Sequence, residues 1–483
     1  MAGPRATRMN IPLRRVATAC GLMVFALMSN VTLIQAFHTD ALGRDPRNPR
    51  ETIDRFAHPR GDILLRDGTV VATEGPGQGR YKYRRVYPDG PMYAPVTGHL
   101  SLYDATGVEL AQDHMLSGAD SEIRMRRLIA NRLEQGASVK LTIDGRAQRA
   151  AYEGLMATGH KGAAVAIDPA TGAILALASY PSYDPNLYST FDGKQLIEAD
   201  RRLRNDPTRP LLNRAIERTY PPGSTFKIVT AAAALSSGFY APGTTVTAPP
   251  WIRLPGTATT LANAGGEKCG NGRPPLALAF RLSCNTAFAE IGLRLGQDTL
   301  RTQAEAFGFN VDDLAIPLPV AKSVYPSNLD RAQTAMSAIG QFDTRATPLM
   351  ITMISAAVAS HGSMMRPYLV EEVRLRDGTI ISVTDPASLP RTVSREVADQ
   401  ITAMMVTVTA PGGTGSAAAI SGVEIAAKTG TAQNAADARD HAVFTAFAPA
   451  AEPRVAVGVL VENGGFGGDT AAPIARAIME AVL

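Results

Sequence analysis

The chain has 483 residues, of which 45% are hydrophobic and 19% are charged. These proportions are ordinary for a folded globular protein and exclude a largely disordered chain. The formal net charge is only +4, and no dense stripe of lysine and arginine interleaved with aromatic residues occurs, so we expect no nucleic-acid partner. The seven histidines lack the spacing of zinc ligands, and we expect neither a metal site nor a cofactor.

The N-terminal segment predicts a membrane anchor. Residues 16–37 contain no charged side chain, and a helix of that length, at about 1.5 Å per residue, matches the ~30 Å hydrocarbon core of a bilayer. Four arginines precede this run, namely Arg5, Arg8, Arg14 and Arg15. Because arginines flanking a span tend to stay in the cytoplasm, we expect a cytoplasmic tail at 1–15 and an extracytoplasmic location for everything after His38. The protein would then be a single-pass protein of the cytoplasmic membrane.

Two other interpretations of the N-terminal segment are weaker. A cleaved signal peptide needs a small-x-small site, which Ile34, Gln35 and Ala36 match poorly, and the apolar run is long for such a peptide. A lipoprotein site at Cys20 would need the apolar run before the cysteine, whereas the run follows it. A retained anchor is therefore the favoured prediction.

Residues 38–140 predict a small juxtamembrane module. A polar stretch rich in arginine and proline leads to two apolar runs, and the turn Arg66-Asp67-Gly68 between them predicts a hairpin. Short strands and helices are expected up to about Val139. The module is too short to hold a second enzyme.

Residues 141–483 have the pattern of one larger α+β domain. A helix is expected at 146–156 with Asp144 as its N-cap, and two apolar strands joined by a turn follow, at 162–167 and 173–178. The remaining elements are a buried helix at 225–235, strands at 423–432, 441–448 and 454–462, and a closing helix at 469–483. Strands at both ends with helices between them predict one sheet that gathers the first and last segments.

Two cysteines, Cys269 and Cys284, fall in the part of the chain that we expect outside the membrane, where disulfides persist. A bond between them would close a short loop and contribute roughly 3 kcal/mol in the chain-entropy model. Two isolated buried thiols are the alternative.

The stretch Pro221-Pro222-Gly223-Ser224-Thr225-Phe226-Lys227 contains the first candidate catalytic pair. The prolines and glycine end the preceding segment, so Ser224 would stand at a helix start with Lys227 three residues on, on the same face. A serine hydroxyl is a weak nucleophile until a base takes its proton, and a neutral, desolvated lysine is such a base. Alone, this pair has the alternative of an ordinary helix start that contains a serine and a lysine.

Two further motifs add side chains of matching chemistry. Ser283-Cys284-Asn285 supplies a second hydroxyl and an amide, although such residues more often cap helices or form turns. Lys428-Thr429-Gly430-Thr431 stands at the end of an apolar strand. There Gly430 would let a substrate backbone approach closely, and Lys428 is suited to hold a carboxylate.

These three motifs, in this order, are the signature of penicillin-binding proteins and their β-lactamase relatives. The chain resembles a class B penicillin-binding protein, a monofunctional D,D-transpeptidase, of the short actinobacterial type that controls elongation or septation. Further stretches look like that family: Leu141-Thr142-Ile143-Asp144, Asp168-Pro169 with Thr171-Gly172, Ile339-Gly340-Gln341 with Thr347-Pro348-Leu349, and Glu462-Asn463-Gly464-Gly465. Two positions depart from it, because Leu65 replaces an aspartate and Val443 a tryptophan.

The resemblance implies a fold and a reaction. The fold would be the α+β penicillin-binding, serine β-lactamase-like domain, an antiparallel sheet with helices on both faces, joined to the small module and one transmembrane helix. In the implied reaction, Ser224 attacks the penultimate D-Ala of a peptidoglycan stem peptide with Lys227 as base, and the same serine binds penicillin and other β-lactams covalently. An amine of a neighbouring stem then resolves the acyl-enzyme and forms the cross-link.

The resemblance also assigns roles to the other motif residues. Ser283 would relay a proton to the leaving group, and Asn285 would orient the base and bind the donor peptide. The backbone N–H groups of Ser224 and Thr431 would form the oxyanion hole. Lys428, Thr429 and Gly430 would complete the substrate-binding strand.

The segment between the anchor and the larger domain leaves no room for a glycosyltransferase. The family likeness therefore implies a separate membrane glycosyltransferase partner, which makes the lipid-linked precursor polymer that this chain would cross-link.

Three alternatives to the transpeptidase function remain open at this point. A β-lactamase of class A would need a glutamate followed four residues later by asparagine, which does not occur between Ser283 and Lys428. A carboxypeptidase would differ only in its acceptor, water, and a scaffold or β-lactam sensor would be expected to carry a damaged motif or a signalling segment.

Overall fold

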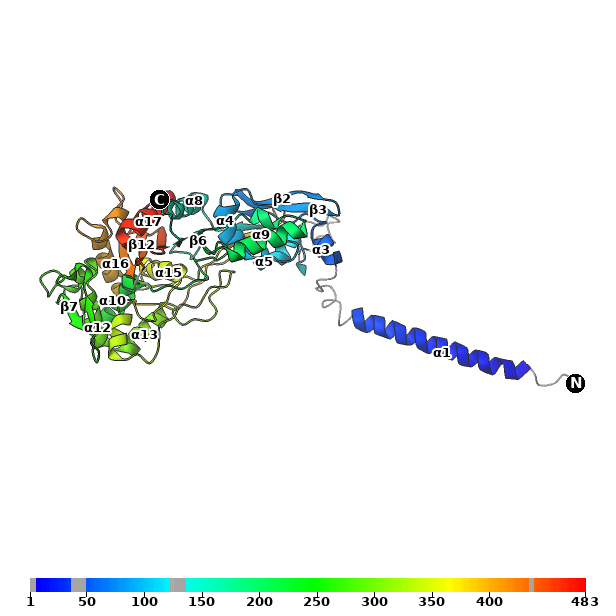
Figure 1. Cartoon of the computed structure of the whole chain (residues 1–483), viewed down its shortest axis with the longest axis horizontal. Coiled ribbons are helices and arrows are strands. Elements are labelled where there is room, and N and C mark those ends of the chain that lie inside the picture. The colour runs from blue at the N-terminus through cyan, green and yellow to red at the C-terminus, as the bar shows by residue number, and fades with distance from the viewer. Residues whose placement is uncertain (1–5, 36–48, 122, 124, 126–135, 434–437) are drawn as a thin grey trace. The chain divides into compact units, whose positions relative to one another are not determined.

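The computed structural model describes residues 6–35, 49–121, 123, 125, 136–433 and 438–483. The chain forms two compact units. The first consists of Met1–His58 with Gly77–Tyr83, and the second of Pro59–Pro76 with Arg84–Leu483. Figure 1 labels the helices and strands along the chain.

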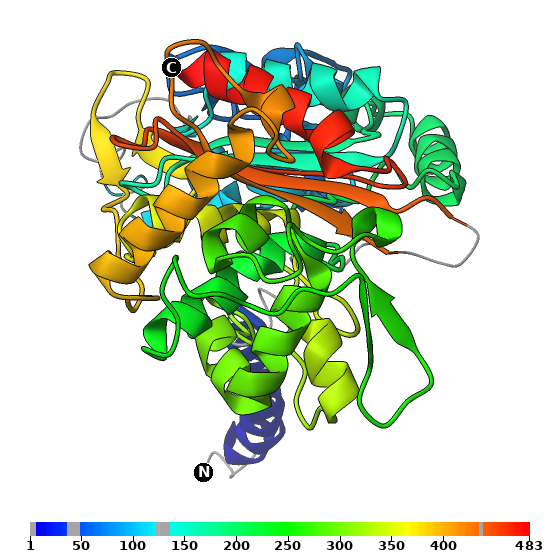
Figure 2. The same ribbon diagram turned by 90° about the vertical axis from the view of Figure 1, so that its left-hand side faces the viewer.

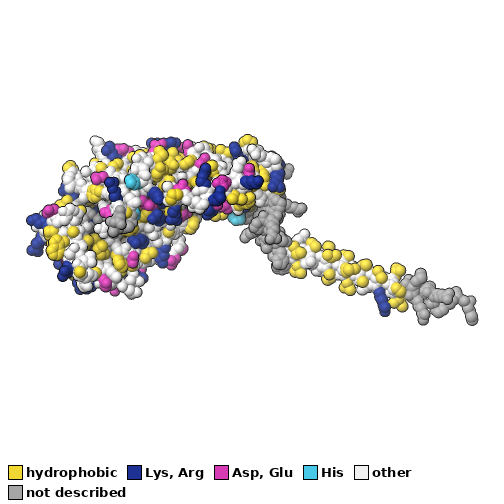
Figure 3. Space-filling view, viewed as in Figure 1, with side chains coloured by type: hydrophobic (Ala, Val, Ile, Leu, Met, Phe, Trp, Pro, Cys, Tyr) yellow, Lys and Arg dark blue, Asp and Glu magenta, His cyan; other side chains and the backbone are white. Residues whose placement is uncertain are grey.

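The first unit contains the predicted membrane-spanning helix. Helix α1, Ala6–Leu33, has a stretch, Ile11–Leu33, that is long and apolar enough to cross a membrane. Hydrophobic side chains line the visible face of this helix in Figure 3. The apolar stretch starts five residues before the predicted start at residue 16, because it includes Arg14 and Arg15 close to its N-terminal end. Residues 36 and 37, where the predicted span ends, lie outside the described residues.

The remainder of the first unit is short. Helix α3, Pro49–Arg55, leads to Phe56, whose carbonyl accepts hydrogen bonds from the backbone N–H groups of Lys82 and Tyr83 at 2.9 and 3.0 Å. The ring of Phe56 packs edge-on against that of Tyr81, with centroids 5.9 Å apart. These contacts join α3 and Phe56 to Gly77–Tyr83.

The second unit contains most of a six-stranded sheet with the order β10-β9-β4-β1-β2-β3, apart from the ends of β2 and β3 that fall within Gly77–Tyr83. Its strands are β1 Ile63–Leu64, β2 Val70–Gln78, β3 Tyr81–Val86, β4 Ser138–Leu141, β9 Val370–Arg374 and β10 Ile380–Val383. Strands β1 and β2 are antiparallel, and the N–H of Gly68 donates to the carbonyl of Leu65 at 2.9 Å in the turn between them. The predicted hairpin is confirmed.

This sheet crosses the position where the sequence suggests a domain boundary. Strand β4 contains residue 140 itself and pairs with β9, with Val139 opposite Val373. The strands of the small module therefore share their sheet with a segment from late in the chain. Three short helices accompany them, namely α4 Gly90–Thr97, α5 Gly107–Ala111 and α6 Asp113–Ser117.

A five-stranded antiparallel sheet, β11-β12-β13-β5-β6, forms the centre of the larger domain. Its strands are β5 Gly162–Ile167, β6 Ile174–Tyr180, β11 Ala426–Ala432, β12 His441–Ala448 and β13 Val455–Val461. The prediction that one sheet gathers the first and last segments is confirmed. Every residue of β12 and β13 is buried, as expected for strands covered on both faces.

Helices cover both faces of this sheet. Helices α8, Gly145–Ala157, and α17, Gly467–Val482, lie on one face, and α15, Pro348–Ala359, lies on the other (Figure 2). The predicted N-cap of α8 is confirmed, because Asp144 accepts hydrogen bonds from the N–H groups of Arg146 and Ala147 at 2.9 and 3.3 Å. Strand β11 is an edge strand, so one side of its backbone is free of strand partners.

A helical region lies below the sheet as Figure 2 shows it. Its elements are α10 Lys227–Ser236, α11 Leu276–Arg281, α12 Asn285–Leu295, α13 Gln297–Ala306, α14 Arg331–Ser337 and α16 Arg395–Thr409, with a two-stranded hairpin of β7 Trp251–Arg253 and β8 Thr260–Ala262. Nine of the 10 residues of α10 are buried, as predicted for this apolar helix. The helix starts two residues later than predicted, because Gly223–Phe226 form a 3-10 turn.

Candidate active site

Ser224 lies on the 3-10 turn that precedes α10, and its side chain is half-buried. Gly223 has a φ of +53°, and a Cβ at this position would come within 2.6 Å of the carbonyl oxygen of Thr431. The N–H of Gly223 donates to the carbonyl of Gly340 at 3.0 Å. The glycine therefore allows the turn to pack directly against the edge strand β11, which brings the first and third motifs together.

Lys227 is fully buried one turn after Ser224. Its Nζ lies 2.8 Å from Oδ1 of Asn285, 2.7 Å from the carbonyl oxygen of Ser283 and 3.3 Å from the hydroxyl of Ser283. Burial, and then the charge of Lys428, lower the pKa of Lys227 well below its usual value. A lysine in this state can be neutral at physiological pH, as a proton acceptor must be.

Ser283 stands between two lysines. It has a φ of +58° in the turn between α11 and α12, a conformation that non-glycine residues adopt rarely and often at functional sites. Its hydroxyl accepts a hydrogen bond from Nζ of Lys428 at 2.8 Å, in addition to the contact with Lys227. The neighbouring residue, Cys284, is joined to Cys269 by a disulfide, with Cα atoms 5.9 Å apart. This bond ties the turn to the loop before α11.

Lys428 is also fully buried, on β11. Besides the hydroxyl of Ser283, its Nζ contacts the carbonyl oxygen of Thr429 at 3.0 Å. Burial lowers the pKa of Lys428 to about 7. The free enzyme therefore holds this side chain close to the point at which it changes charge, and a bound carboxylate would restore the charged form.

In the structure, Gly430 has a packing role within the protein, and its role toward a substrate backbone stays a prediction. A Cβ on Gly430 would lie 3.0 Å from Cγ2 of Thr225 and 3.0 Å from Cβ of Val443, its partner on β12. The space beside the glycine is filled by the Ser224 turn and the neighbouring strand. The glycine thus allows close packing within the protein, between the strand and the helix that bears the serine.

The remaining motif residues complete the edge of the site. Thr431 is partly exposed at the end of β11, and its carbonyl accepts a hydrogen bond from Nε2 of Gln341 at 3.5 Å. The hydroxyl of Thr429 is bonded to that of Thr414, with 2.7 Å between the oxygens. Sequence reasoning did not single out Thr414, because nothing local marks its loop as a partner of β11.

A buried ionic network, also missed from the sequence, lies directly before the Ser224 turn. The carboxylate of Glu462 accepts hydrogen bonds from Arg214 at 3.2 Å, Arg218 at 3.3 Å and the hydroxyl of Tyr220 at 2.8 Å. These partners hold the pKa of Glu462 below its usual value despite burial. The network connects the segment before Ser224 with Glu462, which directly follows β13. The two arginines and the tyrosine lie 242 to 248 residues before Glu462 in the sequence.

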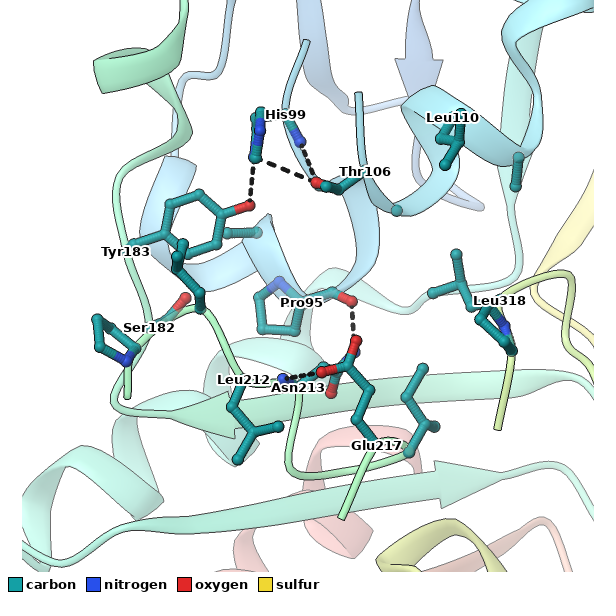
Figure 4. Close-up of a pocket in the computed structure, with 18 of the residues that line it drawn as sticks. Pro95, His99, Thr106, Leu110, Ser182, Tyr183, Leu212, Asn213, Glu217 and Leu318 are labelled. Carbon is teal, nitrogen blue, oxygen red and sulfur yellow. Dashed lines mark hydrogen bonds between the residues drawn. The ribbon is translucent and has the colours of Figure 1, made fainter. Parts of the chain in front are cut away.

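A separate cavity of about 500 Å³ is lined by none of the residues of the three motifs. Figure 4 shows His99 and Tyr183 on one side of this cavity and Asn213 and Glu217 on the other. Nδ1 of His99 lies 2.9 Å from the hydroxyl of Tyr183, and burial raises the pKa of Glu217. The cavity is therefore distinct from the site at Ser224.

A serine at a helix start, a buried lysine one turn on, a serine-asparagine pair and a lysine on an edge strand define a serine acyltransferase of the penicillin-binding and β-lactamase type. The model of the penicillin-binding protein transpeptidase domain matches residues 162–480, and that of the penicillin-binding protein A dimerisation domain matches residues 60–139. The chain belongs to the penicillin-binding protein transpeptidase family, which confirms the resemblance found in its sequence.

Named relatives and solved structures agree with this family. The chain is 46% identical to the peptidoglycan D,D-transpeptidase PbpA of Mycolicibacterium smegmatis, over 98% of this chain and 99% of that protein. It is 43% identical to the PbpA of Mycobacterium tuberculosis H37Rv, with the same coverage. The ceftriaxone acyl-enzyme complex of penicillin-binding protein A from M. tuberculosis superimposes with a TM-score of 0.86 at 43% identity, covering 89% of this chain and 100% of that one. The penicillin G acyl-enzyme complex of the same protein superimposes with a TM-score of 0.84 at 43% identity, covering 88% of this chain and 99% of that one.

Proposed function

We propose that this protein is a peptidoglycan D,D-transpeptidase that forms a serine acyl-enzyme through Ser224 and is inhibited by β-lactams. The observation that carries the proposal is the continuous contact from Lys227 through the hydroxyl of Ser283 to Lys428, with distances of 3.3 and 2.8 Å. These contacts would link a neutral base, Lys227, to a cation, Lys428, close to the nucleophile Ser224. The named activities of the PbpA relatives and the β-lactam acyl-enzymes of the mycobacterial protein support it.

In the first half of the reaction, neutral Lys227 takes the hydroxyl proton of Ser224. The serine oxygen attacks the carbonyl of the penultimate D-Ala, and the negative charge that develops on the carbonyl oxygen faces the N–H groups of Ser224 and Thr431. The peptide C–N bond then breaks, and the terminal D-Ala leaves with a proton passed through the hydroxyl of Ser283. Asn285, bonded to Lys227 at 2.8 Å, holds the base in place.

In the second half, an amine of a neighbouring stem peptide attacks the ester carbonyl. Its proton goes to the base, the ester C–O bond breaks, and Ser224 recovers its hydroxyl proton. The product is a new amide bond, the cross-link. A β-lactam follows the first half only: its ring amide opens, the leaving nitrogen stays attached, and the blocked ester persists.

The same proposal includes a membrane location. Helix α1 would anchor the protein in the cytoplasmic membrane with residues 1–15 inside and the catalytic domain outside, and Arg14 and Arg15 near the start of the apolar stretch Ile11–Leu33 support this orientation. A membrane glycosyltransferase would be the partner that delivers the lipid-linked polymer. The anchor and residues 38–140 would be its docking surface.

Gel labelling of the full chain with fluorescent penicillin tests the nucleophile. The unchanged protein should be labelled, Ser224→Ala should not, and the matched control Ser237→Ala, at the other end of α10, should be labelled normally. Label retained by Ser224→Ala would refute the assignment, and label lost within minutes would indicate a β-lactamase. A peptide substrate with an added amine acceptor separates the remaining alternative, because a carboxypeptidase would release D-Ala without incorporating the acceptor.

A further inference from the structure

The β7–β8 hairpin stands beside the second motif. Figures 1 and 2 show it next to α12, on the outer side of the helical region. The carbonyl of Ala262, the last residue of β8, accepts a hydrogen bond from Nδ2 of Asn285 at 3.0 Å. The other side of the same amide contacts Lys227 at 2.8 Å. One end of the hairpin is therefore continuous with the catalytic site.

The two faces of the hairpin differ in character. Ile252 and Leu261, which are partners across the strands, pack against a small buried cluster. The outward face carries Trp251 and Arg253, both exposed. Trp251 is the chain's one tryptophan, 59% of its surface is accessible, and its cross-strand partner is Ala262.

This outward face presents an aromatic ring and a cation side by side, next to the catalytic site. A tryptophan has a large apolar ring with a negative face, which normally packs against other groups. Here the hairpin places it directly opposite Ala262, the residue whose carbonyl accepts a hydrogen bond from Asn285. The exposed guanidinium of Arg253 lies two residues on along the same strand, on the same face, and it is suited to pair with a carboxylate.

We propose that Trp251 and Arg253 form an outer subsite for the glycan-peptide polymer, which rests on the proposed transpeptidase function. The C–H face of a sugar ring would stack on the indole, and a carboxylate of the stem peptide would pair with Arg253. The polymer fits this surface because it extends far beyond the reacting D-Ala-D-Ala end, and the surface is continuous with the site that holds that end. β-Lactams lack the sugar that would stack on the indole.

The single tryptophan makes binding directly observable. The Ser224→Ala variant should bind substrate without turnover, so we use it as the full-length protein in detergent micelles. We expect un-cross-linked disaccharide-pentapeptide oligomers to shift the fluorescence emission of Trp251 and to reduce its quenching by acrylamide. The free pentapeptide, which lacks sugar, should protect it much less. Unchanged emission and quenching at saturating oligomer would overturn the proposal.

Kinetics provide the second test, with a matched control. Trp251→Ala should raise the KM for the oligomer about five-fold or more with little change in kcat, and Arg253→Gln should do so more weakly. The control Phe239→Ala removes another exposed aromatic ring, 84% accessible, beyond the far end of α10, and should leave both constants unchanged. An unchanged KM in Trp251→Ala would overturn the subsite.

Two outcomes separate this inference from the proposed function. If Trp251→Ala slowed acylation by benzylpenicillin as much as it impaired use of the oligomer, the residue would act through the Ala262–Asn285 contact, and the subsite would be refuted. If the unchanged protein bound penicillin but cross-linked no oligomer under any condition, the transpeptidase function itself would fail.

Discussion

The charge of Lys428 is predicted to set the upper limit of the pH range for acylation. Burial lowers the pKa of this lysine to about 7 in the free enzyme. If the carboxylate of a β-lactam must meet a cation here, the second-order rate constant for acylation falls as pH rises through that value. One pH unit above the pKa, about one molecule in eleven is protonated, so the rate constant should be about ten-fold below its plateau, and about 100-fold below it two units above.

Lys428→Arg tests this explanation, because arginine remains charged throughout the accessible pH range. Stopped-flow acylation by a chromogenic cephalosporin should show a falling limb near pH 7 for the unchanged protein and none for the variant. The acylation rate constant of the variant will be lower at every pH, since the larger guanidinium must fit a buried position. The test therefore rests on how the rate constant changes with pH. Thermal unfolding under the same conditions verifies that the variant is folded. A falling limb at the same pH in the variant would refute the assignment of the limb to Lys428.

Three further predictions follow from the same contacts. Lys227→Arg should abolish acylation, because a guanidinium cannot act as a neutral base. The exposed control Lys322→Arg should be labelled normally by fluorescent penicillin. Near-normal labelling of Lys227→Arg would refute the hypothesis that Lys227 is the base. Arg214→Met should lower the free energy of unfolding by about 3 kcal/mol, the low end for a broken buried ion pair, because the carboxylate keeps two other partners; an unchanged denaturant midpoint would contradict this. Replacing Cys269 and Cys284 together by serine should cost roughly 3 kcal/mol for a separation of 15 residues, measured by urea unfolding, and a loss below 1 kcal/mol would show that the turn is held by other contacts.

Local patterns were sufficient for much of the fold, whereas the site also needed the family signature. Strands β5 and β12 match their predicted bounds, and Asp144 caps α8 as expected, because each depends on neighbours in sequence. The structure brings Lys227, Ser283 and Lys428 into contact. Their association was predictable only through the family signature, since no local pattern places residues 56 and 145 positions apart beside one another.

Long-range pairings account for what was missed. The network around Glu462 and the bond between Thr414 and Thr429 join segments whose proximity is decided by the sheet, and single side chains of these types carry no signal of a partner. The same reason explains the sheet that crosses residue 140. Strand β9 is short and only partly apolar, and its pairing with β4 is specified by the tertiary fold.

The two buried lysines, Lys227 and Lys428, differ in how far their pKa values are lowered, although burial acts on both. Burial disfavours the charged form of both, but the first proton to leave the pair relieves the repulsion that acts on the second. Lys227 loses its proton first, because the charge of Lys428 adds to its desolvation. Once Lys227 is neutral it no longer repels Lys428, whose pKa is then lowered by burial alone, to about 7. Near neutral pH a neutral Lys227 therefore lies close to a Lys428 that is protonated for only part of the time, and the hydroxyl of Ser283 contacts both side chains.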